Sequence, residues 1–133
     1  MLGVDCSVAA AWALADESGP WTHSARTAVE RDGMVVPSLF WFEIRNILIV
    51  NERRGRIDAA DVERFIDELP KLIADVDNEP DGPAVMTLAR SHQLTAYDAA
   101  YLELASRRKL VLCTLDQQLI AAAPKSGVTL WSP

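Results

Sequence analysis

The chain has 133 residues, half of them hydrophobic, which predicts a single domain over residues 1–133 with a substantial core. No apolar run approaches the ~20 residues that a membrane helix needs, and the opening MLGVDCSVAAAWALADE lacks the basic segment of a signal peptide, so we expect a cytoplasmic protein with no membrane partner. The net charge of −6, taken alone, argues against a nucleic-acid partner.

The first part of the chain predicts alternating short strands and helices. Apolar runs predict strands at 2–6 and 34–37, and the stretches between and after them predict helices at 7–17, 21–33 and 38–54. Ser7 and Ser38 are the expected N-caps. Gly33 and Gly55 are the expected stops.

The second part of the chain continues the alternation. It predicts an amphipathic helix at 58–72, further helices at 82–93, 94–105 and 115–123, and strands at 73–77, 109–114 and 128–132. Short apolar strands that alternate with helices predict an α/β fold with a central, mainly parallel sheet and helices on both faces, which is a three-layer α/β/α sandwich.

Four acidic residues fall at one edge of this predicted sheet. Asp5 closes the first strand, and Asp116 lies just beyond the strand at 109–114. Asp98 lies in the first turn of its helix, and Glu43 in the second turn of the helix after 34–37. Because active sites in open parallel sheets lie outside the carboxyl ends of the strands, these four acids from separate segments could converge on one point.

Each aspartate also has a purely structural explanation. Thr95 and Asp98 match the Ser/Thr-x-x-Asp/Glu pattern of a capping box. Asp116, placed after a Thr114 cap, suits the positive end of a helix by ~0.3–1 kcal/mol. Asp5 fits a turn at the end of its strand.

Glu43 is harder to explain by capping, because it lies too deep in its helix. The surrounding sequence, SLFWFEIRNILIV, is apolar enough to predict a half-buried carboxylate, and Asn46 lies one turn further along the same face. Ordinary polarity on a helix surface is the alternative.

Clustered carboxylates repel one another, and a divalent cation removes that repulsion. Oxygen ligands favour a hard ion, Mg²⁺ or Mn²⁺. Cys6 and Cys113 follow apolar stretches and are expected to be buried thiols, while His23 and His92 are far apart, so zinc is disfavoured. Metal ions in such a site activate water for displacement at phosphorus, without a nucleophilic side chain.

These residues and their order resemble the PIN-domain ribonucleases, and in particular the VapC toxins of VapBC toxin–antitoxin pairs. The resemblance covers essentially the whole chain. It rests on the segments VDCS, PSLFWFEIRNIL, LTAYDAAYLELA and TLDQQL. By this resemblance, the four acids of the family match Asp5, Glu43, Asp98 and Asp116, and its supporting polar positions match Ser7, Asn46 and Thr114.

The resemblance implies a Mg²⁺- or Mn²⁺-dependent endonuclease that acts on RNA, a homodimer, and a cognate VapB-type antitoxin that inserts a peptide near the active site. Three alternatives stay open: a PIN nuclease of RNA maturation, a catalytically silent acidic α/β binding module, and a receiver-like signalling module. The receiver-like module is disfavoured because VDCS offers one acid rather than two, and the only late lysines are Lys109 and Lys125.

The charge pattern leaves room for an RNA substrate. Removing the four proposed ligands from the 19 acids leaves 15 against 13 bases. Two basic runs, at 53–56 and 107–109, could contact phosphates, or could be solvated helix ends. Trp12 and Trp41, on early helices, are candidates for an antitoxin or dimer contact.

Overall fold

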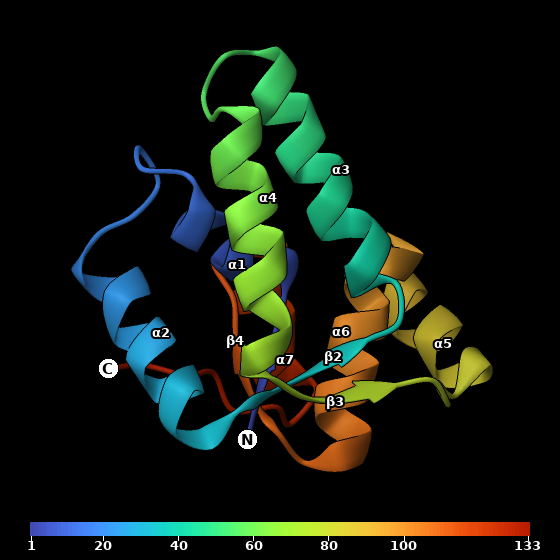
Figure 1. The fold of residues 1–133 in the computed structure, drawn as a ribbon. Helices are drawn as coiled ribbons and strands as arrows, with labels where there is room; N and C mark the ends of the chain where they lie inside the picture. The colour runs from blue at the N-terminus through green and yellow to red at the C-terminus, as the bar shows by residue number, and fades with distance from the viewer.

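A computed structural model describes residues 1–133 and places a four-stranded sheet among the helices (Figure 1). The strands are β1 Leu2–Val4, β2 Met34–Pro37, β3 Ile73–Asp77 and β4 Val111–Cys113. Every pairing is parallel, and the order across the sheet is β3-β2-β1-β4. β1 therefore lies inside the sheet, β3 forms one edge, and the carboxyl ends of all four strands point the same way.

Seven α-helices surround this sheet. They are α1 Cys6–Ala13, α2 Pro20–Asp32, α3 Phe40–Arg53, α4 Ala59–Glu68, α5 Gly82–His92, α6 Ala96–Arg108 and α7 Gln117–Lys125. Helix α6 packs against β1, β2 and β4 and contacts α5 and α7, while α1 contacts α2, α3 and α4 (Figure 1). The predicted three-layer α/β/α sandwich is confirmed. None of the helices combines the length and apolarity that crossing a bilayer would require.

The core explains why these strands can be so short. All residues of β1 and β2 are buried, so both strands lie within the core of the sheet. Phe40, Ile44 and Leu48 of α3 and Leu102 of α6 are also fully buried. This single core, rather than strand length, stabilises the sheet.

Two of the expected N-caps are wrong. Helix α1 begins at Cys6, so Asp5 occupies the N-cap position, and the hydroxyl of Ser7 donates to Asp5 instead. Helix α3 begins at Phe40, with Leu39 at its N-cap. The N–H of Ser38 bonds to the carbonyl of Asp77 at 3.2 Å, which prolongs the pairing of β2 with β3 and delays the helix.

Three predicted elements differ in extent. The helix expected at 58–72 ends at Glu68 and continues as a 3₁₀ turn over Leu69–Leu72, because Pro70 cannot donate an α-helical hydrogen bond. The helix expected at 7–17 ends at Ala13. The strand expected at 128–132 is absent, and only an isolated parallel bridge joins Leu130 to Leu112.

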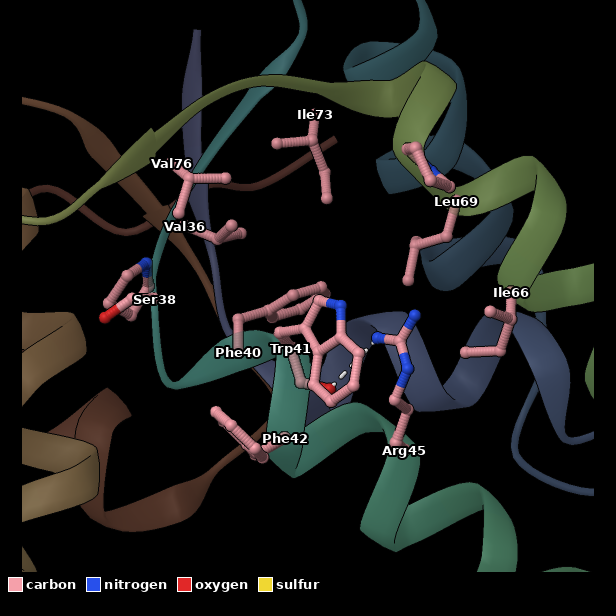
Figure 2. Close-up of a pocket in the computed structure, with 12 residues that line it drawn as sticks. Val36, Ser38, Phe40, Trp41, Phe42, Arg45, Ile66, Leu69, Ile73 and Val76 are labelled. Carbon is pink, nitrogen blue, oxygen red and sulfur yellow. Dashed lines mark hydrogen bonds between the residues drawn. The ribbon is translucent and has the colours of Figure 1, made fainter.

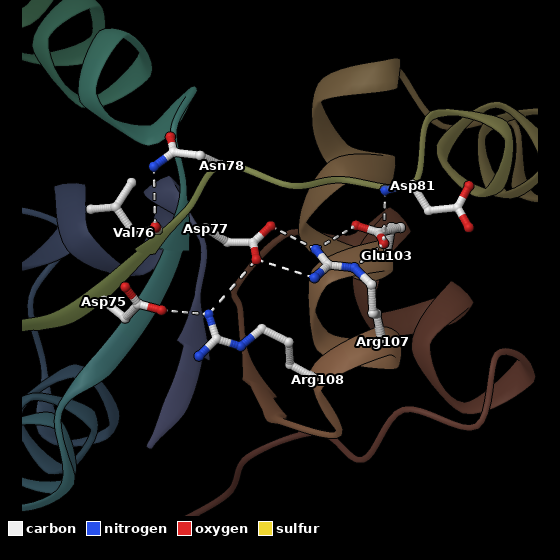
Figure 3. A network of polar contacts seen from close by, with 8 residues as sticks. All are labelled: Asp75, Val76, Asp77, Asn78, Asp81, Glu103, Arg107 and Arg108. Atoms are coloured by element: carbon white, nitrogen blue, oxygen red, sulfur yellow. Dashed lines mark hydrogen bonds and ion pairs between the residues drawn. The ribbon is translucent and has the colours of Figure 1, made fainter.

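An ion-pair network joins the edge strand β3 to the end of α6 (Figure 3). Arg107 donates to Glu103 at 2.6 Å and to Asp77 at 2.6 Å, and Arg108 donates to Asp75 at 2.7 Å. The side chains of Glu103 and Asp77 are buried, and Glu103 also accepts the N–H of Asp81. Arg107 and Arg108 are therefore bound within the chain, which does not support the expectation that they contact phosphates.

Candidate active site

Asp5 lies where β1 ends and the site begins. It is 4% exposed, and two hydroxyls hold its carboxylate. Ser7 donates to Oδ1 at 2.6 Å, and Thr114 donates to Oδ2 at 2.9 Å. Both oxygens are therefore fixed in place. Ser7 and Thr114 do act on a site acid, as expected of supporting polar residues.

The same two hydroxyls bring Asp116 beside Asp5. The Thr114 hydroxyl accepts the N–H of Asp116 at 3.0 Å, and the Ser7 hydroxyl accepts the N–H of Leu115 at 3.0 Å. Since β4 pairs with β1, the loop after β4 lies next to the end of β1. Asp116 is itself the N-cap of α7, and not Thr114 as expected. Its Oδ1 accepts the N–H groups of Gln118 and Leu119.

Glu43 is half-buried and is held by a residue that the sequence did not single out. Because α3 begins at Phe40, Glu43 lies in the first turn and not the second. The hydroxyl of Tyr101 donates to its Oε1 at 2.6 Å. The sulfur of Cys6 lies 3.3 Å from the Tyr101 oxygen. The sequence signal that could have identified Tyr101 is its spacing: it follows Asp98 by three residues, which places both on one face of the helix.

Asp98 opens helix α6 as predicted. Thr95 is the N-cap, and its hydroxyl accepts the N–H of Asp98 at 3.1 Å. Behind it the helix is packed into the core, with Ala99, Tyr101 and Leu102 nearly inaccessible to solvent. Only the Thr95 half of the predicted capping box is formed, so the Asp98 carboxylate is not used as a cap and is presented by a rigid helix.

Electrostatics links the four acids into one patch. Burial raises the pKa of Asp5 to about 6; the hydrogen bonds from Ser7 and Thr114 oppose the rise, and Asp116 adds to it. Burial also raises the pKa of Glu43, with a further contribution from Asp98. The pKa of Asp98 is raised by burial and then by Asp116. Like charges at this range favour protonation or a bound cation.

The donor set at this patch consists of oxygen atoms. No three of the acidic, histidine or cysteine side chains are gathered closely enough to hold one metal ion between them. The Cys6 and Cys113 thiols are buried as predicted, and burial raises the pKa of both, that of Cys113 to about 12, so they are poor ligands at neutral pH. The donor type of the carboxylates, oxygen, is the one that a hard cation such as Mg²⁺ or Mn²⁺ prefers.

Two hollows flank the acidic patch on the side of α3. One, of about 570 Å³, is lined by Leu39, Phe42, Glu43, Asn46 and Tyr97, and it places Asn46 beside Glu43 as expected. The other is an apolar groove of about 350 Å³ between α3, the end of α4 and β3 (Figure 2). Phe42 lines both.

Comparison with known proteins gives consistent results. The family model described as PIN domain matches residues 4–125. Over 118 residues the chain is 32% identical to Exonuclease VapC9 of Pyrobaculum aerophilum, covering 89% of this chain and 82% of that protein. The crystal structure of PAE2754 from Pyrobaculum aerophilum superposes with a TM-score of 0.71 at 29% identity, over 90% of this chain and 83% of the other.

Proposed function

The chain belongs to the PIN domain family, and we propose that it is a Mg²⁺- or Mn²⁺-dependent endoribonuclease, the toxin of a VapBC toxin–antitoxin pair. The observation that supports this proposal is that Asp5 and the backbone of Asp116 share the Thr114 hydroxyl at the carboxyl edge of the sheet. The charge of Asp116 acts on Asp98, and that of Asp98 acts on Glu43. The name of the Pyrobaculum relative, Exonuclease VapC9, supports both the nuclease and the VapC assignment.

The acids would hold the divalent cation, which supplies activated water and charge stabilisation at the phosphodiester. The chain's own residues prepare the ligands. Ser7 and Thr114 fix both oxygens of Asp5, and Tyr101 fixes one oxygen of Glu43. Asp98 and Asp116 stand at the amino ends of α6 and α7, where the helix dipoles favour negative charge.

The residues around the site favour water, rather than a side chain, as the nucleophile. Cys6, directly after Asp5, is buried, and burial raises the pKa of its thiol, so it is not available as a thiolate nucleophile.

As partners we propose an RNA substrate, a second copy of the chain and a VapB-type antitoxin in the cytoplasm. Trp41 is 54% exposed and lines the apolar groove in Figure 2, which suits a contact surface. Trp12 is only partly exposed, since its indole N–H bonds to the carbonyl of Thr22, and it is a weaker candidate.

The first test is cleavage of a circular single-stranded RNA, which has no ends and is opened only by an internal cut. We expect linear products with Mg²⁺ or Mn²⁺ and none with excess EDTA. The ion should also raise the melting temperature of the parent protein, by binding the folded state alone. Cleavage that persists in EDTA would overturn the metal assignment, and digestion of linear RNA alone would make the enzyme an exonuclease.

The toxin role is tested by expression. The chain alone should arrest growth, and co-expression with the product of a small neighbouring reading frame should restore growth. Cleavage in vitro without growth arrest would favour a nuclease of RNA maturation instead.

A further inference from the structure

Two of the site acids are each preceded by a highly exposed aromatic residue. Phe42, immediately before Glu43, is 71% exposed, and Tyr97, immediately before Asp98, is 63% exposed. Isolated exposed apolar residues are common. These two, however, line the same 570 Å³ hollow, together with Glu43 and Asn46. Two aromatic faces and one amide therefore open directly beside the proposed catalytic acids.

The aromatic surface continues from this hollow to a cation. The ring of Trp41 packs edge-on against Phe42, with centroids 4.9 Å apart, and the guanidinium of Arg45 lies 3.6 Å from the Trp41 ring centroid (Figure 2). Arg45 is held there by a hydrogen bond to the carbonyl of Trp41. A row of stackable rings that ends in a fixed positive charge is the arrangement that binds single-stranded nucleic acid.

We propose that this hollow is a nucleobase subsite, in which an unpaired RNA base next to the cleaved phosphodiester stacks on Phe42 and Tyr97. The side-chain amide of Asn46, which can both donate and accept, faces the edge of that base. Arg45 contacts a backbone phosphate further along the strand. This inference rests on the proposed nuclease function and names its substrate as single-stranded RNA.

The alternative occupant, an apolar peptide, fits the neighbouring groove better. That groove is lined by Val36, Ile66, Leu69, Ile73 and Val76 and contains no acid, whereas the hollow contains Glu43. Covering the hollow with an apolar peptide would bury that carboxylate further, which is costly. A base presents a polar edge as well as a stacking face. Phe42, the shared wall, thus separates the two kinds of surface.

The test uses an oligouridine RNA of about ten nucleotides that carries one 2-aminopurine, whose fluorescence falls when it stacks. Binding is measured in Ca²⁺, a hard cation with the same ligand preference. The variants Phe42→Leu and Tyr97→Leu keep apolar bulk but lose the ring, and Phe42→Tyr keeps it. Met86→Ala removes a side chain of α5 that is 43% exposed and serves as the control.

We expect Phe42→Leu and Tyr97→Leu each to weaken binding about 10-fold and to abolish the quenching. Phe42→Tyr and Met86→Ala should match the parent. Replacing the 2-aminopurine with an abasic nucleotide should cost the parent the same factor, and should cost Phe42→Leu nothing more. The subsite would be overturned if Phe42→Leu lowered the affinity for the 2-aminopurine RNA and for the abasic RNA by the same factor. It would also be overturned if the variants bound RNA like the parent but no longer bound a protein partner.

The outcomes also separate this inference from the proposed function. If the 2-aminopurine quenching depends on Phe42 but the protein cuts no RNA with Mg²⁺ or Mn²⁺, the subsite proposal stands and the nuclease proposal is overturned. If Phe42→Leu and Tyr97→Leu change neither RNA cleavage nor RNA binding, the nuclease proposal stands and the subsite proposal is overturned.

Discussion

The hydroxyl of Tyr101 donates a 2.6 Å hydrogen bond to Oε1 of Glu43, across 58 residues of sequence. Tyr101 is 3% exposed and belongs to the packed face of α6, so its oxygen cannot move far. The sulfur of Cys6, directly after Asp5, lies 3.3 Å from the Tyr101 oxygen. A core helix thus sets the orientation of a carboxylate at the site, as outer partners do for metal ligands in general.

Tyr101→Phe should reduce ion affinity and cleavage by about 10-fold or more while the fold is kept. The ring volume is unchanged, and the loss of one partly buried hydrogen bond costs about 1 kcal/mol. Because the Tyr101 bond lowers the pKa of Glu43, its removal raises that pKa further. The acidic limb of the pH–rate profile should therefore move to higher pH.

The measurements for this variant are the pH–rate profile and the calorimetric affinity for Mg²⁺. Tyr97→Phe is the matched control, since it removes a phenol oxygen from the exposed face of the same helix. A profile and an affinity equal to those of the parent would show that Tyr101 only fills the core.

Local sequence predicted much of the fold. The strands at 34–37 and 73–77 match residue for residue, because short apolar runs between helical stretches have few alternatives. Asp5 and Asp116 were expected together for the same reason, since parallel strands end at one edge. The position of Asp98 beside Thr95 followed from the capping pattern.

Contacts between distant residues could not be predicted in this way. The i,i+4 spacing of Glu103 and Arg107 is a local signal for their ion pair. Nothing near Glu103 indicates that the backbone N–H of Asp81, 22 residues away, also donates to its carboxylate, so its burial was not foreseen. The 128–132 segment has a strand-like pattern, but it reaches β4 only through Leu130. Pairing and burial of this kind are set by tertiary packing rather than by local propensity.

Arg107→Met should lower the free energy of unfolding by about 2–3 kcal/mol, because it leaves Glu103 buried without its cation and leaves Asp77 with only the longer, 3.7 Å contact to Arg108. Those carboxylates are 3% and 9% exposed. The Arg107 hydrogen bond is the main cause that lowers the pKa of Asp77. In the parent, this lowered pKa of Asp77 contributes stability at pH values above the pKa that Asp77 has in the unfolded chain. The loss of stability in Arg107→Met should therefore shrink as pH falls and Asp77 becomes protonated.

Chemical denaturation at several pH values measures this deficit. The control is Arg108→Met, whose closest partner, Asp75, is 52% exposed, so its loss should cost at most about 1 kcal/mol. Cleavage per folded molecule should be unchanged in both variants, because neither arginine contacts a site acid. Equal costs for the two would mean that burial of the network is unimportant.

Asp5 should give stability an unusual pH dependence in the presence of EDTA. Burial raises its pKa from 3.8 to about 6 in the folded protein, so the folded state binds more protons than the unfolded state between these values. Its contribution to stability is therefore complete below about pH 4 and is lost as pH rises through about 6, by on the order of 2–3 kcal/mol.

Asp5→Asn isolates this effect, since the amide does not titrate. The difference in unfolding free energy, parent minus variant, should fall from pH 4 to pH 7, and saturating Mg²⁺ should restore part of the parent's loss. A flat difference curve in EDTA would mean that the Asp5 carboxylate ionises in the folded protein as readily as in the unfolded chain.

Asp98 and Thr95 allow the capping role of this helix terminus to be separated from catalysis. Asp98→Asn should keep the fold and should not lower the stability at neutral pH, because burial and Asp116 raise the pKa of Asp98 and so disfavour its charged form in the folded protein. It should abolish cleavage and growth arrest, since a neutral amide binds a hard cation less well. Thr95→Ala removes the cap bond to the Asp98 N–H and should cost roughly 1 kcal/mol, with cleavage per folded molecule retained.

Circular dichroism, thermal melting and RNA cleavage on the same preparations test all three expectations. If Asp98→Asn cut RNA at the parental rate, Asp98 would be a helix-terminal residue only, and the metal-site proposal would lose the acid that links Asp116 to Glu43.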